Sequence, residues 1–141
     1  MTIQQIQDEL QQEFELFGTD WELKYEHLIS MGNSLIRLNP EEKTETRLIK
    51  GCQSNVWLLA ELKDGKVFYK ADSDAIITRG MIALIIRVLN GQYPEDISNA
   101  SFDFLNKIGL ISHLSPTRAN GLLSMIRQMK LYAITFTANP Q

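Results

Sequence analysis

The sequence predicts one α+β domain, in which a small three-stranded antiparallel sheet is covered on one face by helices. Three observations predict this fold class. Apolar residues recur at helical spacing near both ends of the chain, they alternate with other residues in the middle, and an Asp-Gly pair separates two strand-like runs. The length of 141 residues fits a single domain spanning residues 1–141. We expect the elements in the order α-α-β-β-β-α-α-α.

Two amphipathic helices are expected at the N-terminal end. Apolar residues at helical spacing from Ile3 to Phe17 predict the first helix, which ends near Gly18. The second helix is expected from Asp20 to Met31, with Thr19 and Glu22 forming a capping box at its start. A mostly irregular connection then leads to the sheet.

Three strands are expected in the middle of the chain, where the apolar period changes from helical to alternating. They cover about Thr46–Lys50, Asn55–Leu62 and Val67–Asp72. Between the last two, Asp64 and Gly65 predict a tight hairpin turn, because both turn positions favour positive φ. A sheet this small must cover one face with helices to bury it.

A long helix from Asp74 to Asn90 is expected to follow the sheet. Asp72 or Ser73 is placed to cap its first turn. Gly80, inside this helix, costs about 1 kcal/mol relative to alanine. We therefore expect another element to pack closely against Gly80.

Further helices are expected in the C-terminal third of the chain. The stretch "YPEDI" opens a short helical segment, and "FDFLNKIG" predicts another helix that Gly109 ends. Ser115 is placed to cap a final helix, with Pro116 at its first position, running to about Thr135.

The composition limits the classes of function. The net charge of −3 and the pI of about 5.4 argue against a broad electrostatic grip on nucleic acid. The densest apolar run, Met81 to Leu89, is broken by Arg87 and is too short to span a bilayer. One cysteine cannot form an internal disulfide, and the polar N-terminal stretch lacks the features of a signal peptide. We therefore expect a cytoplasmic protein that binds neither membranes nor nucleic acid.

The single cysteine, Cys52, stands just before the apolar central strand rather than inside it. Nucleophilic work by a cysteine needs access to the sulfur and a group that stabilises the thiolate, because a free thiol titrates near pH ~8.5. Gly51 lets the backbone turn sharply at the sulfur, and Gln53 and Ser54 supply polar groups. Ordinary loops share these features, so an interaction domain with an incidental cysteine stays open as an alternative.

Three kinds of chemistry are open to this thiol. A metal site or cluster scaffold needs several soft ligands, and His27 and His113 show no ligand-like spacing, so we expect no bound metal. A small cysteine-dependent hydrolase or transferase would use His113 or His27 as its base. A single accessible cysteine can also act alone, by exchanging with another sulfur and carrying one away as a persulfide.

Three sequence blocks follow one another along the chain: "GCQSNVW" at 51–57, "DSDA" at 72–75 and "SPTRANG" at 115–121. In their composition, order and spacing, these blocks resemble the SufE family of sulfur acceptors. The resemblance runs from about Trp21 to Ala133, which is most of the chain.

The resemblance implies a covalent sulfur carrier rather than an enzyme. Proteins of this family work with a cysteine desulfurase of the SufS type, and the pyridoxal phosphate belongs to that partner. By this likeness, Cys52 takes the persulfide sulfur, stimulates the desulfurase and passes the sulfur on to a scaffold that assembles iron-sulfur clusters. The chain itself is expected to hold no cofactor.

Further site residues are expected around Cys52. The resemblance implies that Arg118, at the start of the last helix, stabilises the thiolate or contacts the partner. Other candidates for partner contact, chosen by their position near the cysteine or the long helix, are Gln53, Ser54, Asn55, Asp72 and Asp74. Helix capping also explains the two aspartates without any function. We expect the thiol to be largely covered in the isolated protein.

Overall fold

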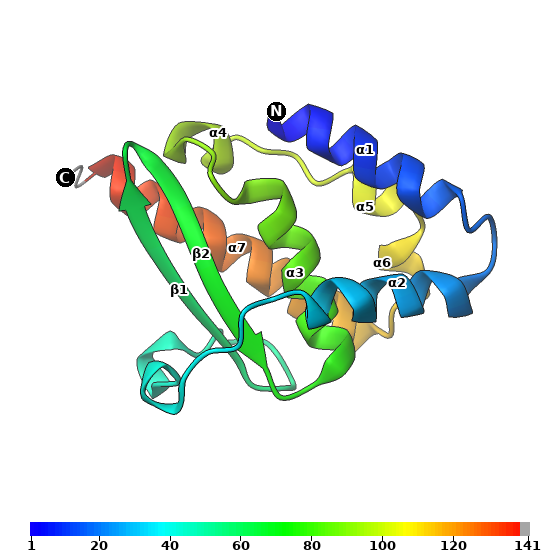
Figure 1. Cartoon of the computed structure of the whole chain (residues 1–141), viewed down its shortest axis with the longest axis horizontal. Helices are drawn as coiled ribbons and strands as arrows, with labels where there is room; N and C mark the ends of the chain where they lie inside the picture. Colours follow the sequence, from blue (N-terminus) through cyan, green and yellow to red (C-terminus); the bar gives the residue numbers. More distant parts are fainter. Residues whose placement is uncertain (139–141) are drawn as a thin grey trace.

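The computed structural model describes residues 1–138, and it has the α+β class that the sequence predicts (Figure 1). The strands are β1 (Val56–Lys63) and β2 (Lys66–Ser73). The helices are α1 (Ile3–Glu15), α2 (Trp21–Asn33), α3 (Ile76–Leu89), α4 (Pro94–Ser98), α5 (Phe104–Lys107), α6 (Leu110–His113) and α7 (Pro116–Ala138). Two short 3-10 turns, Pro40–Glu42 and Glu45–Arg47, lie in the connection between α2 and β1.

The two strands form one antiparallel hairpin, in which Val56 pairs with Ser73 and Lys63 pairs with Lys66. The turn between them contains Asp64 at φ 54° and Gly65 at φ 78°. Asp-Gly supplies this left-handed backbone at low cost. The hairpin predicted from these two residues is therefore confirmed.

The third strand predicted at Thr46–Lys50 is wrong, because residues 1–138 contain only two strands. The segment begins instead as a 3-10 turn, and it then makes a single bridge from Leu48 to Trp57. The amide of Ile49 donates to the carbonyl oxygen of Val56 at 2.8 Å. After that contact the chain turns away at Gly51, which has a φ of 93°. The pairing therefore ends after one bridge, although the residues have strand-forming character.

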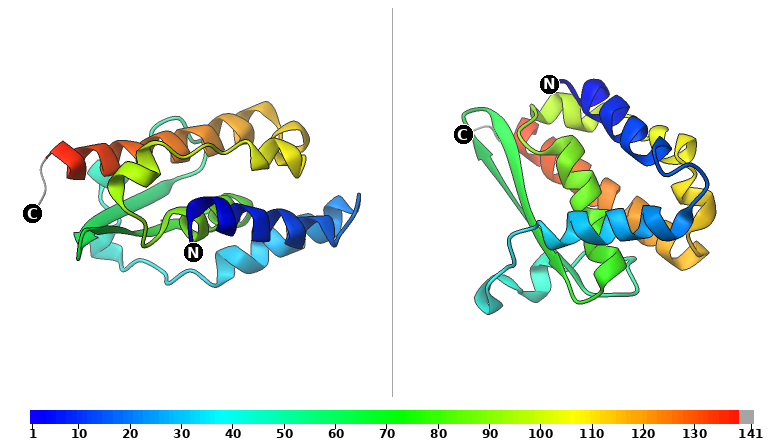
Figure 2. Two further views of the ribbon diagram at one scale, coloured as in Figure 1. Left: turned by 90° about the horizontal axis from the view of Figure 1, so that it is seen from above. Right: turned by 45° about the vertical axis from the view of Figure 1, so that its right-hand side comes forward.

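Helix α3 is the centre of the molecule, with α1 and α2 on one side and α7 on the other (Figure 2). It also packs on β2, while α7 packs on β1. Every residue from Thr78 to Ile86 is buried, which is typical of a helix that is apolar all round.

The crossing of α2 and α3 is close because glycines face each other there. A Cβ at Gly80 would collide with the carbonyl oxygen of Leu28, and a Cβ at Gly32 would lie 2.8 Å from the amide nitrogen of Gly80. The close packing expected at Gly80 is confirmed.

Three details of the helices correct the sequence-based expectations. At α2, Asp20 is the N-cap and accepts from the Leu23 amide, so the Thr19 capping box is wrong. At α3, Ala75 is the N-cap, because Asp72 and Ser73 are still part of β2. After the hairpin there are five helices within residues 1–138, where the expected order has three. The helices expected at "YPEDI" and "FDFLNKIG" are present as α4 and α5, and α6 follows Gly109 as a helix that was not expected.

The predicted start of the last helix is correct. The hydroxyl of Ser115 accepts a hydrogen bond from the amide of Arg118 at 3.3 Å, and Pro116 is the first helical residue. This cap sets the direction in which α7 leaves the short helices α5 and α6.

Candidate functional site

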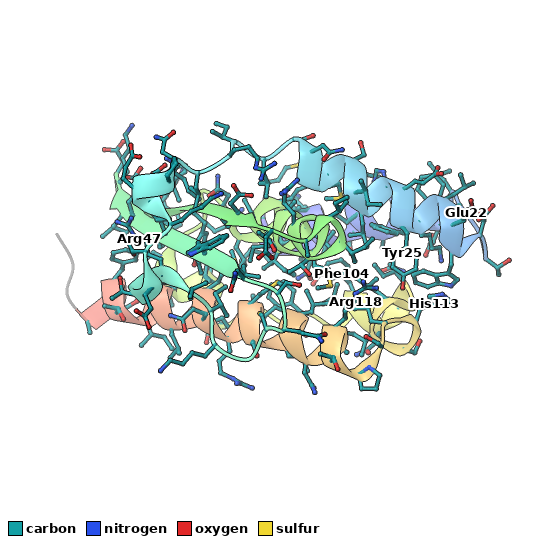
Figure 3. All side chains as sticks on the ribbon, turned by 90° about the horizontal axis from the view of Figure 1, so that it is seen from below. Glu22, Tyr25, Arg47, Phe104, His113 and Arg118 are labelled. Carbon is teal, nitrogen blue, oxygen red and sulfur yellow. The ribbon has the colours of Figure 1, made fainter. Side chains whose placement is uncertain are left out.

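Cys52 lies in the loop that joins the Leu48 bridge to β1, and this loop crosses the surface of α7 (Figure 3). The loop approaches α7 so closely that a Cβ on Gly51 would collide with the hydroxyl oxygen of Ser124. Gly51 also has the left-handed φ of 93° that disfavours other residues. Both requirements explain why a glycine precedes the cysteine.

The thiol of Cys52 is half-buried and points at the backbone of α7. Its Sγ donates a hydrogen bond to the carbonyl oxygen of Gly121, at 3.6 Å. A Cβ on Gly121 would lie 3.7 Å from Sγ, which is an ordinary van der Waals contact, so the glycine leaves open space beside the sulfur without being required for its approach. Burial raises the pKa of the Cys52 thiol above that of a free cysteine. The resting thiol is therefore protonated at neutral pH.

A cavity of about 90 Å³ surrounds this sulfur, between the loop, the start of α3 and the start of α7. Polar and charged residues form one part of its wall: Gln53, Ser54, Thr78, Thr117 and Arg118. The remaining wall, besides Cys52, is apolar: Ala75, Met81, Gly121 and Met125. The space admits only a few atoms, which suits a thiol carrying one extra atom better than an organic substrate.

The end of the loop is clamped to the start of α3. The backbone amide and the side-chain amide of Asn55 both donate to the carboxylate of Asp74, at 3.2 and 3.0 Å. The hydroxyl of Ser73 donates to the carbonyl oxygen of Asn55 at 2.7 Å. Residues 50–54 lie between this clamp and the backbone hydrogen bond of Ile49. They include Cys52 and are held by fewer contacts.

Comparison of the chain with known protein families identifies its family. A family model for SufE, described as an Fe-S metabolism associated domain, matches residues 8–133. The chain belongs to the SufE family. The match includes Cys52 and every residue that lines its cavity.

Relatives of this SufE-family chain occur in bacteria and plants. A SufE-like protein of Synechocystis is 40% identical over 118 residues, covering 84% of this chain and 74% of the relative. One of Rhizobium meliloti is 36% identical over 119 residues, covering 81% and 85%. SufE-like protein 1 of Arabidopsis thaliana, named as chloroplastic/mitochondrial, is 36% identical over 135 residues, covering 94% of this chain and 36% of the relative.

The SufE-family fold is also seen in a solved structure. The solution structure of a hypothetical protein from Thermus thermophilus has a TM-score of 0.78 to this chain, at 18% identity, and covers 95% of this chain and 97% of that one. This likeness shows the fold. Within residues 1–138, no helix has the length and apolar character that a membrane crossing requires.

Arg118 of this SufE-family chain lines the rim of the cavity from the first turn of α7, where its side chain is exposed (Figure 3). No ion pair between Arg118 and another described residue is present. Burial raises the pKa of Cys52, and it acts on the resting thiol without a counteracting contribution from Arg118. Its guanidinium is free to meet an anion that enters the cavity or a group on a partner.

The predicted partner contacts of the SufE-family loop differ in their accessibility. Gln53, Asn55 and Asp74 are exposed and Ser54 is half-buried. Asp72, in contrast, is only 1% exposed, so its prediction as a partner contact is corrected.

The carboxylate of Asp72 is used inside the protein. It lies 3.0 Å from Arg37 Nε, 3.2 Å from Arg79 Nε and 3.5 Å from Lys43 Nζ. These contacts join β2 and α3 to the connection that follows α2. Asp72 is therefore a structural anchor behind the site.

Both histidines are occupied away from the thiol. His27 pairs with Glu13 at 3.1 Å, and the His113 ring stacks on Trp21 with 3.9 Å between ring centroids. His113 ends α6 and lies beside Tyr25 (Figure 3). Neither histidine lines the cavity, so the described residues give Cys52 no histidine base.

The sequence missed part of the cavity. Gly121 was matched to a family block without a role, and Thr78, Met81 and Met125 were not singled out as site residues. The one usable signal is helical spacing, since Arg118, Gly121 and Met125 lie on one face of α7. Among residues 1–138, no three His, Cys, Asp or Glu side chains are placed together to hold a metal ion.

Proposed function

We propose that this SufE-family chain is a sulfur carrier whose acceptor is Cys52. It takes the terminal sulfur of a persulfide on a SufS-type cysteine desulfurase, thereby stimulates that enzyme, and passes the sulfur to a scaffold for iron-sulfur cluster assembly. The observation that carries this proposal is the position of the chain's only thiol, half-buried in a cavity of about 90 Å³ within the family-matched region. Family membership supports the link to iron-sulfur metabolism.

The transfer is a thiol exchange between two sulfur centres. Cys52 first loses its proton, and its thiolate attacks the terminal sulfur of the donor persulfide. A new S–S bond forms at Cys52, the donor's S–S bond breaks, and the donor cysteine leaves as a thiolate. Cys52 then holds one additional sulfur, and no net oxidation occurs. The pyridoxal phosphate that creates the persulfide stays with the partner, so the carrier holds no cofactor.

In this proposal the partner takes part in activating Cys52, because the resting thiol is half-buried, is bonded to the carbonyl oxygen of Gly121 and has a raised pKa. A protonated thiol is a poor nucleophile, so docking must move the sulfur into a more polar or more positive environment. The loop is suited to this movement because its contacts with α7 and α3 are few, while Asn55 keeps its end fixed to Asp74. We assign the exposed Gln53 and Arg118 to the surface that meets the desulfurase.

Mass spectrometry of the intact chain tests the proposal most directly. After incubation with a SufS-type desulfurase and cysteine, we expect a mass gain of one or more sulfur atoms at Cys52, and faster turnover of the desulfurase. Cys52→Ser should abolish both effects while its thermal unfolding matches the wild type, because serine is nearly isosteric. Unchanged stimulation by Cys52→Ser would eliminate the carrier role. Partner-free turnover of an ester or amide would instead support the hydrolase alternative.

A further inference from the structure

Two methionines share the cavity with Cys52. Met81 of α3 is 1% exposed and Met125 of α7 is 0% exposed, and both residues line the cavity. The chain has five methionines, and two of them meet its single cysteine here. Three sulfur-bearing residues, from a loop and two helices, are therefore among the ten residues that line one small space.

The helix geometry brings Met125 toward the thiol. Met125 follows Gly121 by one turn of α7, and a long helical side chain leans back over the preceding turn. At that turn Gly121 has no side chain, and its carbonyl oxygen contacts Sγ of Cys52. Met81 lies one turn after Thr78 on α3, and both residues face the same cavity.

We propose that this cavity is a binding site for a soft monovalent cation, with Cu(I) as the biological representative. Thiolate and thioether ligands select Cu(I) over harder ions, and Cu(I) accepts a small number of sulfur ligands. The ligands are Sγ of Cys52 and the thioether sulfurs of Met81 and Met125. The binding site itself needs only the cavity and its sulfurs, whereas its consequence for sulfur delivery rests on the proposed function.

The charges of the site favour a monovalent ion over zinc. When Cu(I) binds, the Cu–S bond forms, the S–H bond of Cys52 breaks and the proton goes to solvent, with no change in oxidation state. The copper thiolate is neutral, so the burial that disfavours a bare thiolate does not oppose it. A zinc ion would leave a net positive charge beside Arg118, and the cavity wall contains no imidazole or carboxylate to complete its ligand set.

Cu(I) bound at this site would block the sulfur acceptor. The metal and an incoming sulfur compete for the same Sγ, and a cavity of about 90 Å³ does not hold both. Copper bound in this cavity would therefore stop a SufE-family carrier from delivering sulfur.

An anaerobic titration of the full chain with Cu(I), buffered by a chromophoric Cu(I) chelator, tests the site without any desulfurase. We expect a single equivalent to bind, and Cys52→Ser to remove the binding. Met81→Leu and Met125→Leu conserve volume but each removes a ligand, so each should weaken affinity by at least about tenfold, the lower end of the cost of losing even a group behind a ligand. Met129→Leu is the matched control, because Met129 is equally buried on α7 but lies outside the cavity.

Two results would overturn the site. One is wild-type affinity in the Met81→Leu and Met125→Leu variants, and the other is zinc binding as tight as Cu(I) binding. X-ray absorption of the wild-type Cu(I) complex gives a readout that needs no variant: a sulfur-only shell with more than one sulfur is expected, and one sulfur with nitrogen or oxygen ligands contradicts the proposal. Sulfur loading by a desulfurase, measured separately, tests the carrier role alone.

Discussion

The thiol of Cys52 donates its hydrogen bond to the carbonyl oxygen of Gly121, and the two atoms lie 3.6 Å apart. A backbone carbonyl accepts from a thiol but repels a thiolate, so this contact favours the protonated sulfur. Burial acts in the same direction. The resting protein therefore keeps its sulfur in the less reactive form until something displaces the loop from α7.

The first prediction concerns the reactivity of Cys52 as a function of pH. Because burial raises the pKa of this thiol, the rate of alkylation by iodoacetamide should rise with pH to a midpoint higher than that of a free cysteine. The chain unfolded in urea is the control and should show a lower midpoint. A folded midpoint at or below that of the unfolded chain would contradict the role assigned to burial.

Gly121→Ala should separate stability from sulfur acceptance. The new Cβ lies 3.7 Å from Sγ of Cys52, which is ordinary contact, and alanine is favoured over glycine in a helix by roughly 0.8–1 kcal/mol. We expect an unchanged or higher melting temperature together with several-fold slower sulfur loading, because the methyl group occupies the cavity. Asn120→Ala, an exposed change on the same helix, should leave the loading rate unchanged. Normal loading by Gly121→Ala would show that the sulfur does not use this space.

Asn55→Ala should release the end of the cysteine loop. The variant loses the side-chain hydrogen bond to Asp74, which contributes about 1 kcal/mol at most at an exposed site. We expect faster alkylation of Cys52 at a fixed pH, with little change in the far-ultraviolet circular dichroism. Asn106→Ala, an exposed change on α5, is the control. Equal alkylation rates in wild type and Asn55→Ala would mean that the clamp does not restrain the thiol.

Asp72→Asn should destabilise the fold strongly. The carboxylate is 1% exposed, and its loss leaves the nearly buried Arg79 without its ionic partner. We expect the free energy of unfolding in urea to fall by about 3 kcal/mol at neutral pH. Asp96→Asn, an exposed change on α4, should cost far less. A loss as small as that of the control would refute the anchoring role.

Acid should remove the stabilisation that the Asp72 carboxylate gives to the wild-type fold. Burial alone would raise the pKa of Asp72, but hydrogen bonds from Arg37 and from the amides of Ser73 and Leu38 outweigh it and lower the pKa below 3.8. A carboxyl group whose pKa is lower in the folded state than in the unfolded chain stabilises the fold at pH values above its unfolded pKa. That stabilisation is lost as the pH falls through the pKa of the group in the folded state. Urea unfolding between pH 5 and about pH 3 should show this loss in the wild type and a flatter profile in Asp72→Asn.

Local signals predicted the parts of the fold that are decided locally. The hairpin follows from Asp64 and Gly65, whose turn needs positive φ. The start of α7 follows from the Ser115 cap and Pro116. Each feature depends on residues within one turn of each other, so periodicity and capping rules were sufficient.

Contacts between distant segments could not be predicted in the same way. Asp72 is a residue type that often caps helices, but its role is decided by its contacts with Arg37 and Lys43. These two residues lie in the connection after α2, far from Asp72 in the sequence. Met81 and Met125 match ordinary core positions of their helices. The two methionines line the cavity only because the cysteine loop packs against α3 and α7.

Because Cys52 is the one thiol in 141 residues, oxidative damage to this chain has a defined course. A sulfenic acid formed at Cys52 finds no resolving thiol within these 141 residues. Its disulfide must therefore join it to another molecule, either a small thiol such as glutathione or a second copy of the chain. Recovery then depends on an external reductant, and the extent of oxidation can be read as added mass or as a covalent dimer on a non-reducing gel.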